Sequence, residues 1–268
     1  MDFGMPTLVE LNTIEENAEL CNKLGLQFVE LNMNLPICQI EALSNVDYLE
    51  NIMNKYNVYF TIHLDENINV ADFNSLLANA HIQTTLKTIE LAKKLNIKSL
   101  TMHMNKGVYF SLPNGKFYLF NKYSEYYFSQ LAKFKKLCEE AIGDYDIKIN
   151  IENTSGWSDI AKQGVELLLQ SKVFGLTYDI GHSHSHKHVD EEIIFKHISK
   201  LHHCHFHDAI GKENHLPLFT GEIDLKERYY LMDKYKCRCV VEVKDIPALT
   251  QSIENLRIFE KEKTINGI

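Results

Sequence analysis

Short apolar runs alternate with longer amphipathic stretches along the whole chain. Each apolar run has the length of a strand, and the stretches between the runs carry apolar residues at spacings near three and four, which is the period of a helix. Alternation of this kind favours β/α units and a parallel sheet. The eight expected strands are residues 3–9, 26–31, 58–64, 97–104, 147–151 and 173–178, a histidine-rich run that begins at residue 201, and residues 237–243.

Helix signals separate these strands. Residues Thr13 to Glu16 have the pattern of a capping box, which opens a helix that we expect to stop at Gly25. Eight β/α units without a linker or a repeat predict one α/β domain over residues 1–268, a (β/α)8 TIM barrel. Further helices are expected near residues 40–55 and at 72–95, 122–142 and 247–260, and residues 105–121 are expected to form a loop long enough to fold over a site.

The composition fits one large globular domain and argues against two classes of partner. The chain has 268 residues, and barrels of this type have about 250. Its net charge of −8 offers no basic surface for nucleic acid, although bound divalent ions would add positive charge that this count omits. No apolar run approaches the roughly 20 residues of a membrane span, so no membrane partner is expected. A homo-oligomer is compatible with the sequence, which leaves the oligomeric state open.

Cysteine usage indicates the compartment. The six cysteines have neither a disulfide nor a zinc-ribbon spacing, and no signal peptide precedes them, so a reducing cytoplasm is expected. Cys237 and Cys239 lie in an apolar run whose alternation places both on the face opposite Glu242. We interpret them as small buried hydrophobic residues rather than metal ligands.

Polar side chains that can bind metals stand at the carboxyl ends of six of the eight expected strands. In a barrel of this type the active site is built from those strand ends and the loops that follow them, so residues far apart in sequence converge on one pocket. Imidazole and carboxylate groups are common ligands of zinc, manganese and similar divalent ions. The residues at these ends are His63, His103, Glu152, Asp179 with His182, His205, and Glu242.

The histidine-rich strand strengthens this expectation. Period-two alternation places His203, His205 and His207 on one face of the strand. A single strand histidine is more often a hydrogen-bonded core residue, whereas three imidazoles on one face favour a metal, a substrate or a carboxylate. Glu213 and His215 follow closely on a loop that a strand end would carry over the same site.

The number of candidate ligands leaves the number of ions open at one to three. Zinc or manganese is favoured, and magnesium and cobalt are compatible with the same kind of site. A single ion would need four ligands, for which Glu152, Asp179, His205 and Glu242 are the candidates. The remaining residues would hold further ions or contact substrate: His63, His103, His182, Glu213 and His215, together with Lys244 and with Trp157, for which plain packing is the alternative.

These residues resemble the xylose isomerase-like barrels, a superfamily that contains sugar phosphate isomerases and epimerases and the endonuclease IV nucleases. Resemblance to the epimerases implies that Glu152, Asp179, His205 and Glu242 bind one metal, and that the two glutamates form an acid/base pair. The motifs that carry the resemblance are Glu152, Asp179-Ile-Gly-His182, His205-Phe-His-Asp208 with His215-Leu-Pro-Leu, Gly221-Glu-Ile-Asp224, and Glu242.

Resemblance to endonuclease IV implies a different reaction, the cleavage of abasic DNA by three zinc ions. The ligand positions of that family match most of the candidates above, but Glu213 stands where the family has aspartate. A nuclease must also grip a kinked duplex with basic loops. Residues 32–38 contain no Lys or Arg, and His63 is followed by Leu-Asp-Glu-Asn, so nucleic acid is not the expected partner.

The reaction expected from the sequence is therefore isomerisation or epimerisation of a small sugar or sugar phosphate. Abstraction of a proton next to a carbonyl creates an enediolate, and a divalent ion offsets its charge. Two carboxylates on opposite sides of the substrate, here Glu152 and Glu242, would remove the proton from one face and return it to the other. The endonuclease IV-like phosphodiesterase and a metal-binding barrel without turnover remain the alternatives.

Overall fold

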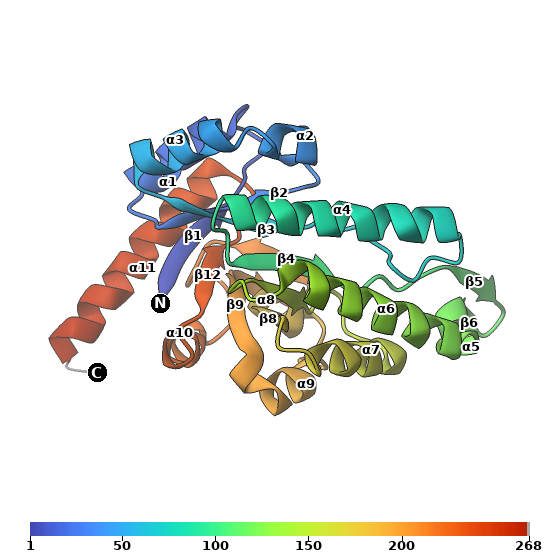
Figure 1. Ribbon diagram of the computed structural model, residues 1–268. Coiled ribbons are helices and arrows are strands. Elements are labelled where there is room, and N and C mark those ends of the chain that lie inside the picture. Colours follow the sequence, from blue (N-terminus) through green and yellow to red (C-terminus); the bar gives the residue numbers. More distant parts are fainter. Residues whose placement is uncertain (267–268) are drawn as a thin grey trace.

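The computed structural model describes residues 1–266, and at its centre is a closed barrel of eight parallel strands (Figure 1). The strands follow the order β1-β12-β9-β8-β7-β4-β3-β2 around the barrel, which confirms the expected (β/α)8 TIM barrel. The barrel strands are β1 (Asp2–Pro6), β2 (Phe28–Asn32), β3 (Tyr59–His63), β4 (Ser99–His103), β7 (Lys148–Glu152), β8 (Phe174–Asp179), β9 (Leu201–Phe206) and β12 (Arg238–Val241).

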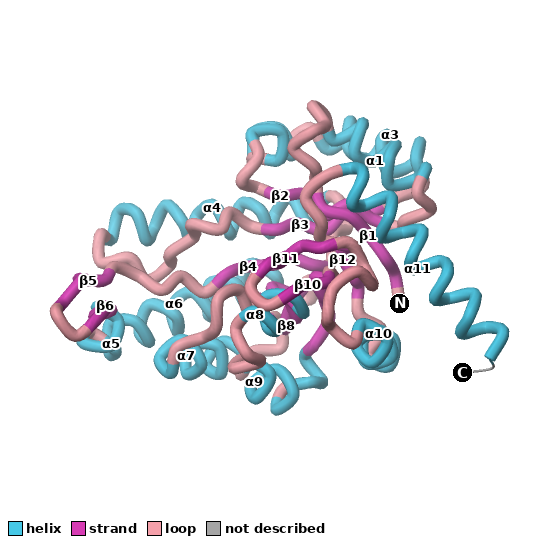
Figure 2. Tube along the Cα trace, turned by 180° about the vertical axis from the view of Figure 1, so that it is seen from behind, coloured by secondary structure: helices cyan, strands magenta, loops and turns pink. Residues whose placement is uncertain are grey.

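Helices surround the barrel (Figures 1 and 2) and cover the outer face of its strands. Parallel strands enclosed in this way are buried on both faces, which explains why they appear in the sequence as nearly continuous apolar runs. The longer helices are α1 (Ile14–Lys23), α3 (Val46–Tyr56), α4 (Ser75–Lys94), α6 (Ser124–Ile142), α7 (Asp159–Leu169), α10 (Leu225–Lys234) and α11 (Ile246–Asn266). The short ones are α2 (Ile40–Leu43), α5 (Leu119–Lys122), α8 (Ile180–Ser185) and α9 (Glu191–Lys196), with 3-10 turns at Pro36–Cys38 and Ile198–Lys200.

The capping box before α1 is present as expected. Thr13 Oγ1 accepts a hydrogen bond from the Glu16 backbone N–H at 3.1 Å, and Glu16 Oε2 accepts one from the Thr13 backbone N–H at 3.2 Å. The single helix expected near residues 40–55 is instead divided into α2 and α3. Asn45 causes the break, because its side chain accepts a hydrogen bond from the Tyr48 backbone N–H and thereby starts a new helix.

Two hairpins stand where the sequence suggested only loops. β5 (Tyr109–Leu112) and β6 (Gly115–Tyr118) pair antiparallel within the expected loop, and β10 (Asp208–Ile210) pairs with β11 (Glu213–Leu216) after β9. The β5–β6 hairpin lies on the side of the molecule away from the N-terminus (Figures 1 and 2). Helices α7 to α10 belong to the later β/α units, for which no residue ranges were predicted from the sequence. The last barrel strand ends at Val241, so Glu242 follows β12 instead of lying inside it.

The strand register brings the polar strand ends together. In the parallel pairing of β4 with β7, His103 lies opposite Glu152, and in the pairing of β8 with β9, Asp179 lies opposite His205. The apolar residues form the core around them, and Cys237 and Cys239 are fully buried there, which confirms their interpretation as small hydrophobic residues. None of the helices in the described part of the chain is long and apolar enough to cross a membrane.

Candidate metal and substrate site

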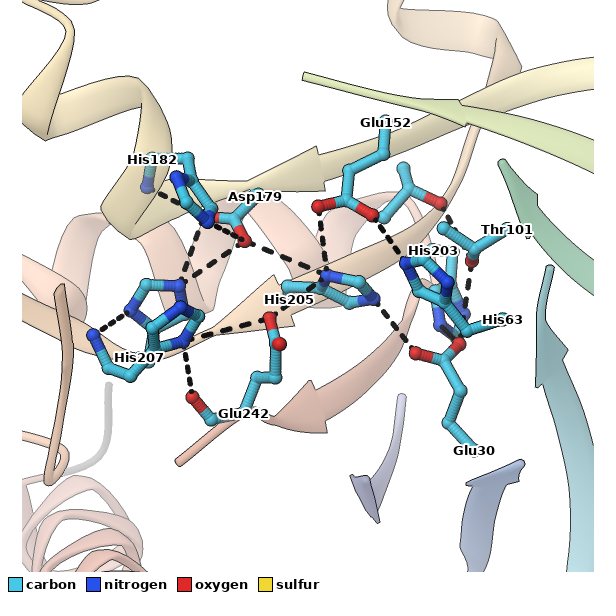
Figure 3. Close-up of polar contacts among 12 residues, drawn as sticks. Glu30, His63, Thr101, Glu152, Asp179, His182, His203, His205, His207 and Glu242 are labelled. Carbon is cyan, nitrogen blue, oxygen red and sulfur yellow. Dashed lines mark hydrogen bonds and ion pairs between the residues drawn. The ribbon is translucent and has the colours of Figure 1, made fainter. Parts of the chain in front are cut away.

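Side chains at the ends of four adjacent strands gather around the ring of His205 (Figure 3). Glu152 ends β7, Asp179 ends β8, His205 lies in β9 and Glu242 follows β12. His205 Nδ1 lies 3.3 Å from Glu152 Oε1, 3.6 Å from Asp179 Oδ2 and 3.1 Å from Glu242 Oε2. We call these four residues the carboxylate–histidine centre.

The carboxylate–histidine centre has the donor chemistry and spacing of a divalent metal site. His205 Nδ1 is buried and has no hydrogen-bond partner in the described part of the chain, although three carboxylates surround it. An ion about 2.1 Å from each ligand would hold neighbouring ligand atoms roughly 3.0 to 3.4 Å apart. The observed 3.1 to 3.6 Å is close to that spacing. The residues present therefore fit a divalent ion.

Glu30, on β2, fixes the orientation of His205 from the other ring nitrogen. Glu30 Oε2 lies 2.9 Å from His205 Nε2, and Glu30 Oε1 lies 2.8 Å from His203 Nε2. Burial acts to raise the pKa of Glu30, but the two histidines beside it dominate and hold that pKa well below its usual value. Because a carboxylate only accepts hydrogen bonds, His205 donates its Nε2–H to Glu30 and presents Nδ1 to the centre.

Two further imidazoles contact the second oxygen of Glu152. His63 Nε2 lies 3.1 Å and His103 Nε2 lies 3.2 Å from Glu152 Oε2. His63 donates its Nδ1–H to the Leu64 carbonyl at 2.7 Å, so its Nε2 beside a carboxylate needs either a second proton or a cation. Burial acts to lower the pKa of His63, but the neighbouring Glu152 carboxylate overcomes this and raises the pKa to about 9.

Asp179 is held in place by groups on three sides. It caps α8 by accepting a hydrogen bond from the His182 backbone N–H at 2.7 Å, and His207 Nε2 donates to its Oδ1 at 3.1 Å. The Asn153 side chain bonds both the N–H and the C=O of Asp179, at 2.8 and 2.9 Å. Gly181 leaves room for this arrangement, because a Cβ there would lie 2.0 Å from the His207 ring.

Glu242 and His215 form the outer edge of the site. His215 has a left-handed backbone with φ of 59°, and its Nδ1–H donates to the Glu242 carbonyl at 3.0 Å. Burial lowers the pKa of His215 to about 4, so its ring is neutral and its Nε2 lone pair is available to a ligand or substrate. Lys244 Nζ lies 3.0 Å from Glu242 Oε1 and is more than half exposed.

Glu152 and Glu242 of the carboxylate–histidine centre border a central cavity of about 360 Å³ at the carboxyl end of the barrel, whereas Asp179 and His205 are not among its lining residues. Its volume falls in the usual range for small-ligand sites, about 300 to 1,000 Å³. A substrate in this cavity would meet carboxylates, neutral and charged imidazoles and one ammonium group. The lining residues are Pro6, Glu30, Asn32, His63, Glu66, His103, Glu152, Thr154, His182, His215, Glu242 and Lys244.

Two of the residues expected at this site lie elsewhere. Glu213 is exposed directly after the turn of the β10–β11 hairpin, and it belongs to none of the groups of potential metal ligands found among the described residues. Trp157 is buried but lines a neighbouring cavity instead of the central one. The sequence placed Glu213 and Trp157 at the site because each stands close to a candidate ligand along the chain. It revealed neither the β10–β11 hairpin, which carries Glu213, nor the second cavity, which Trp157 lines.

Glu30 and His207 contact residues of the site in ways that the sequence did not reveal. Glu30 lies in β2 and pairs with His203 and His205. His207 directly follows β9, and it contacts Asp179 and stacks on His215 with ring centroids 4.3 Å apart. Period-two alternation did place the three histidines on one face, but their partners come from other strands.

A family model described as xylose isomerase-like TIM barrel matches residues 18–262. Among solved structures, a D-tagatose 3-epimerase-like protein is similar over 100% of both chains, with 22% identity and a TM-score of 0.80. The apo 3-keto-D-glucoside 4-epimerase of E. coli covers 97% of this chain and 99% of its own, with 12% identity and a TM-score of 0.74.

The IolI protein, whose structure holds a zinc atom, is similar over 99% of this chain and 97% of its own, with 16% identity and a TM-score of 0.70. Identities this low establish the common fold alone. No curated protein matches the chain by sequence.

Proposed function

The chain belongs to the xylose isomerase-like TIM barrel family, and from this premise we propose that it is a divalent-metal-dependent isomerase or epimerase of a small sugar. The observation that carries the proposal is the convergence of Glu152, Asp179 and Glu242 on His205 Nδ1, at 3.1 to 3.6 Å. Epimerisation next to a carbonyl can use two carboxylates beside a positive charge; Glu152 and Glu242 would be the carboxylates, and a divalent ion at the centre would supply the charge.

The donor set supports zinc or manganese at the carboxylate–histidine centre. Glu152, Asp179, His205 and Glu242 would hold the ion, and Glu30 would keep His205 in the tautomer that ligation requires. The IolI structure, which has the same fold, holds zinc. A divalent ion bound here would polarise the substrate oxygens and offset the negative charge that develops next to the carbonyl.

The two glutamates would act as the acid/base pair from different environments. Glu152 is almost fully buried, and its second oxygen contacts His63 and His103. The second oxygen of Glu242 contacts Lys244 at the mouth of the cavity. Burial acts to raise the pKa of both carboxyls, but His205 and the other cations around them hold both pKa values well below the usual range. One carboxylate would accept the substrate proton, and the other would carry a proton taken from water and return it to the opposite face.

The central cavity supports a small polar substrate. Lys244 is the one Lys or Arg among its lining residues, and that lysine is already paired with Glu242. This charge balance favours an unphosphorylated sugar over a sugar phosphate. The names of two proteins with the same fold, a D-tagatose 3-epimerase-like protein and a 3-keto-D-glucoside 4-epimerase, make ketohexoses and keto-glucosides the substrates to test first.

The experiment is proton exchange in heavy water. The zinc- or manganese-loaded protein is incubated in D2O with a panel of ketohexoses and keto-glucosides, and proton NMR follows the hydrogens next to the carbonyl. We expect at least one sugar to lose such a hydrogen and to convert to its epimer or isomer. A metal-loaded protein that exchanges no hydrogen in any member of the panel would rule out this function.

A second candidate function is phosphodiester cleavage. It rests on the two imidazoles, His63 and His103, that contact Oε2 of Glu152. His63, Glu152 and His205 lie close enough to share an ion, as do His207, His215 and Glu242, so the described residues offer more ligand sets than one ion needs. Several zinc ions would suit phosphodiester cleavage. The exposed position of Glu213 and the acidic Glu66 at the cavity weigh against a DNA substrate. Hydrolysis of abasic-site DNA by zinc-loaded protein is the test.

A further inference from the structure

A second cavity lies beside the central one at the same end of the barrel. It has a volume of about 540 Å³. Three segments border both cavities, because residues 103, 154 and 182 line the central cavity and residues 105, 155 and 186 line the second. Lys106 crosses between two of these segments, since its Nζ donates to the Ser155 carbonyl at 3.2 Å. We call the second space the aromatic cavity.

The lining of the aromatic cavity is suited to a flat apolar group. Four aromatic side chains border it, Tyr118, Phe120, Tyr127 and Trp157, together with aliphatic residues such as Val189. Phe120 and Tyr127 pack against each other with ring centroids 4.6 Å apart. Aromatic side chains offer large apolar surfaces and favour offset or edge contacts with another ring.

Trp157 adds a directional group to this surface. Its side chain is 6% exposed, and its indole Nε1–H has no acceptor among the described residues. A buried donor without a partner is costly, so an oxygen atom supplied by a ligand would relieve it. The backbone of Trp157 is fixed by a hydrogen bond of 2.6 Å from its N–H to Asp190 Oδ1. Burial of the residue also restricts the indole.

The two lysines of the aromatic cavity already have partners. Lys106 bonds Ser155, and Lys162 lies 3.6 Å from Glu192. Asp159 adds a negative charge to the lining. The cavity is thus a poorer match for a phosphate than for an uncharged ring that has an oxygen at its edge.

We propose that the aromatic cavity binds an aryl substituent of the substrate, so that the protein accepts a keto sugar that is joined through its anomeric oxygen to an aromatic ring and keeps its carbonyl elsewhere on the sugar. This rests on the proposed function, which places the sugar ring at the carboxylate–histidine centre. The aryl ring would pack among Tyr118, Phe120 and Trp157. The linking oxygen, or a substituent of the ring, would accept the Trp157 Nε1–H.

The single tryptophan of the chain makes the test direct. Its indole gives one Nε1–H signal in a nitrogen–proton correlation spectrum, which we would follow in metal-loaded protein during titration with phenyl β-D-glucopyranoside. Methyl β-D-glucopyranoside is the matched ligand without the ring. We expect the phenyl compound to shift the indole signal saturably and to bind about ten-fold tighter than the methyl compound, as burial of an aromatic ring predicts.

Two exposed valines give a matched pair of variants. Val189 lines the aromatic cavity and Val108 does not, and their exposed fractions are 45% and 53%. Val189→Phe should fill part of the cavity and weaken the phenyl glycoside about five-fold or more while it leaves the methyl glycoside unchanged. Val108→Phe should leave both affinities unchanged, and because both valines are exposed, neither variant should prevent folding.

Three outcomes would overturn the inference: equal affinities for the two glycosides, no saturable indole shift at any soluble concentration, or a Val189→Phe variant that binds the phenyl glycoside like the parent. Failure of the proposed function is recognised separately. A protein that shows the indole shift but exchanges no sugar hydrogen in heavy water keeps the aromatic cavity as a binding site and loses the isomerase or epimerase assignment.

Discussion

His205 Nε2 and Glu30 Oε2 lie 2.9 Å apart, on the side of the imidazole ring opposite the atom that faces Glu152, Asp179 and Glu242. Because Glu30 binds Nε2, only Nδ1 of His205 remains available to share an ion with the other three carboxylates. His203 bonds the second oxygen of Glu30 and Thr61 donates to the same oxygen, so Glu30 itself has little freedom to move. The carboxylate–histidine centre depends on this buried group beneath it.

Glu30→Gln should therefore weaken metal binding without removing a ligand. Loss of the carboxylate partner of a metal-binding histidine typically costs about 10- to 100-fold in affinity. Zinc titration by calorimetry, with circular dichroism as a check on folding, measures the effect. Glu66→Gln is the control, because Glu66 lines the same cavity but is exposed. Equal zinc affinity in Glu30→Gln and the parent would show that Glu30 does not position His205.

Glu152→Gln and Glu242→Gln should each reduce sugar turnover by about 10²- to 10⁴-fold, the usual contribution of a general acid or base. Glutamine keeps the shape of the side chain and one oxygen but cannot accept the proton. Deuterium exchange in heavy water measures the chemical step, and metal content must be determined in parallel because both residues belong to the centre. Glu213→Gln should behave like the parent. Full activity in either of the first two variants would exclude the acid/base role.

In the metal-free protein, the raised pKa of His63 should make the free energy of unfolding fall as the pH rises. The pKa rises from 6.5 to about 9, because the Glu152 carboxylate outweighs burial. Protonated His63 therefore contributes stability that is complete below about pH 6.5 and is lost as the pH rises through about 9. The free energy of unfolding in urea should fall over that interval, and the fall should be smaller in His63→Gln. An NMR titration midpoint of His63 near 6.5 would contradict this prediction.

The pattern of the sequence predicted the barrel well because its strands are buried on both faces. Elements that depend on exposed residues were missed, such as the β5–β6 hairpin, whose strands are almost entirely exposed. The six polar strand ends were found because a parallel barrel collects them at one edge. Their hydrogen bonds could not be predicted, since Glu30 and His205 are 175 residues apart and only the closure of the barrel brings them into contact.

The buried cysteines should resist modification in the folded protein. Burial raises the pKa of Cys21 to about 12 and contributes most to raising that of Cys38 to about 11, so thiolate is scarce at neutral pH. All six cysteines are free and buried. A maleimide followed by mass spectrometry should add to none of them in native protein within the time that modifies all six in urea. Rapid labelling of one native cysteine would indicate local opening around that residue.

Metal content per chain separates the two candidate reactions. Asp179, His205 and Glu242 lie close enough to share one ion, and Glu152 lies 3.3 Å from the same His205 nitrogen, so we expect one ion that survives dialysis, and Asp179→Asn should remove it. His63→Ala should leave this ion in place, because His63 does not belong to the group formed by Asp179, His205 and Glu242. Elemental analysis of protein purified without chelator, combined with anomalous scattering from crystals, gives both the number and the position of the ions. Three zinc ions that include His63, His103 and His215 as ligands would instead favour phosphodiester hydrolysis over sugar isomerisation.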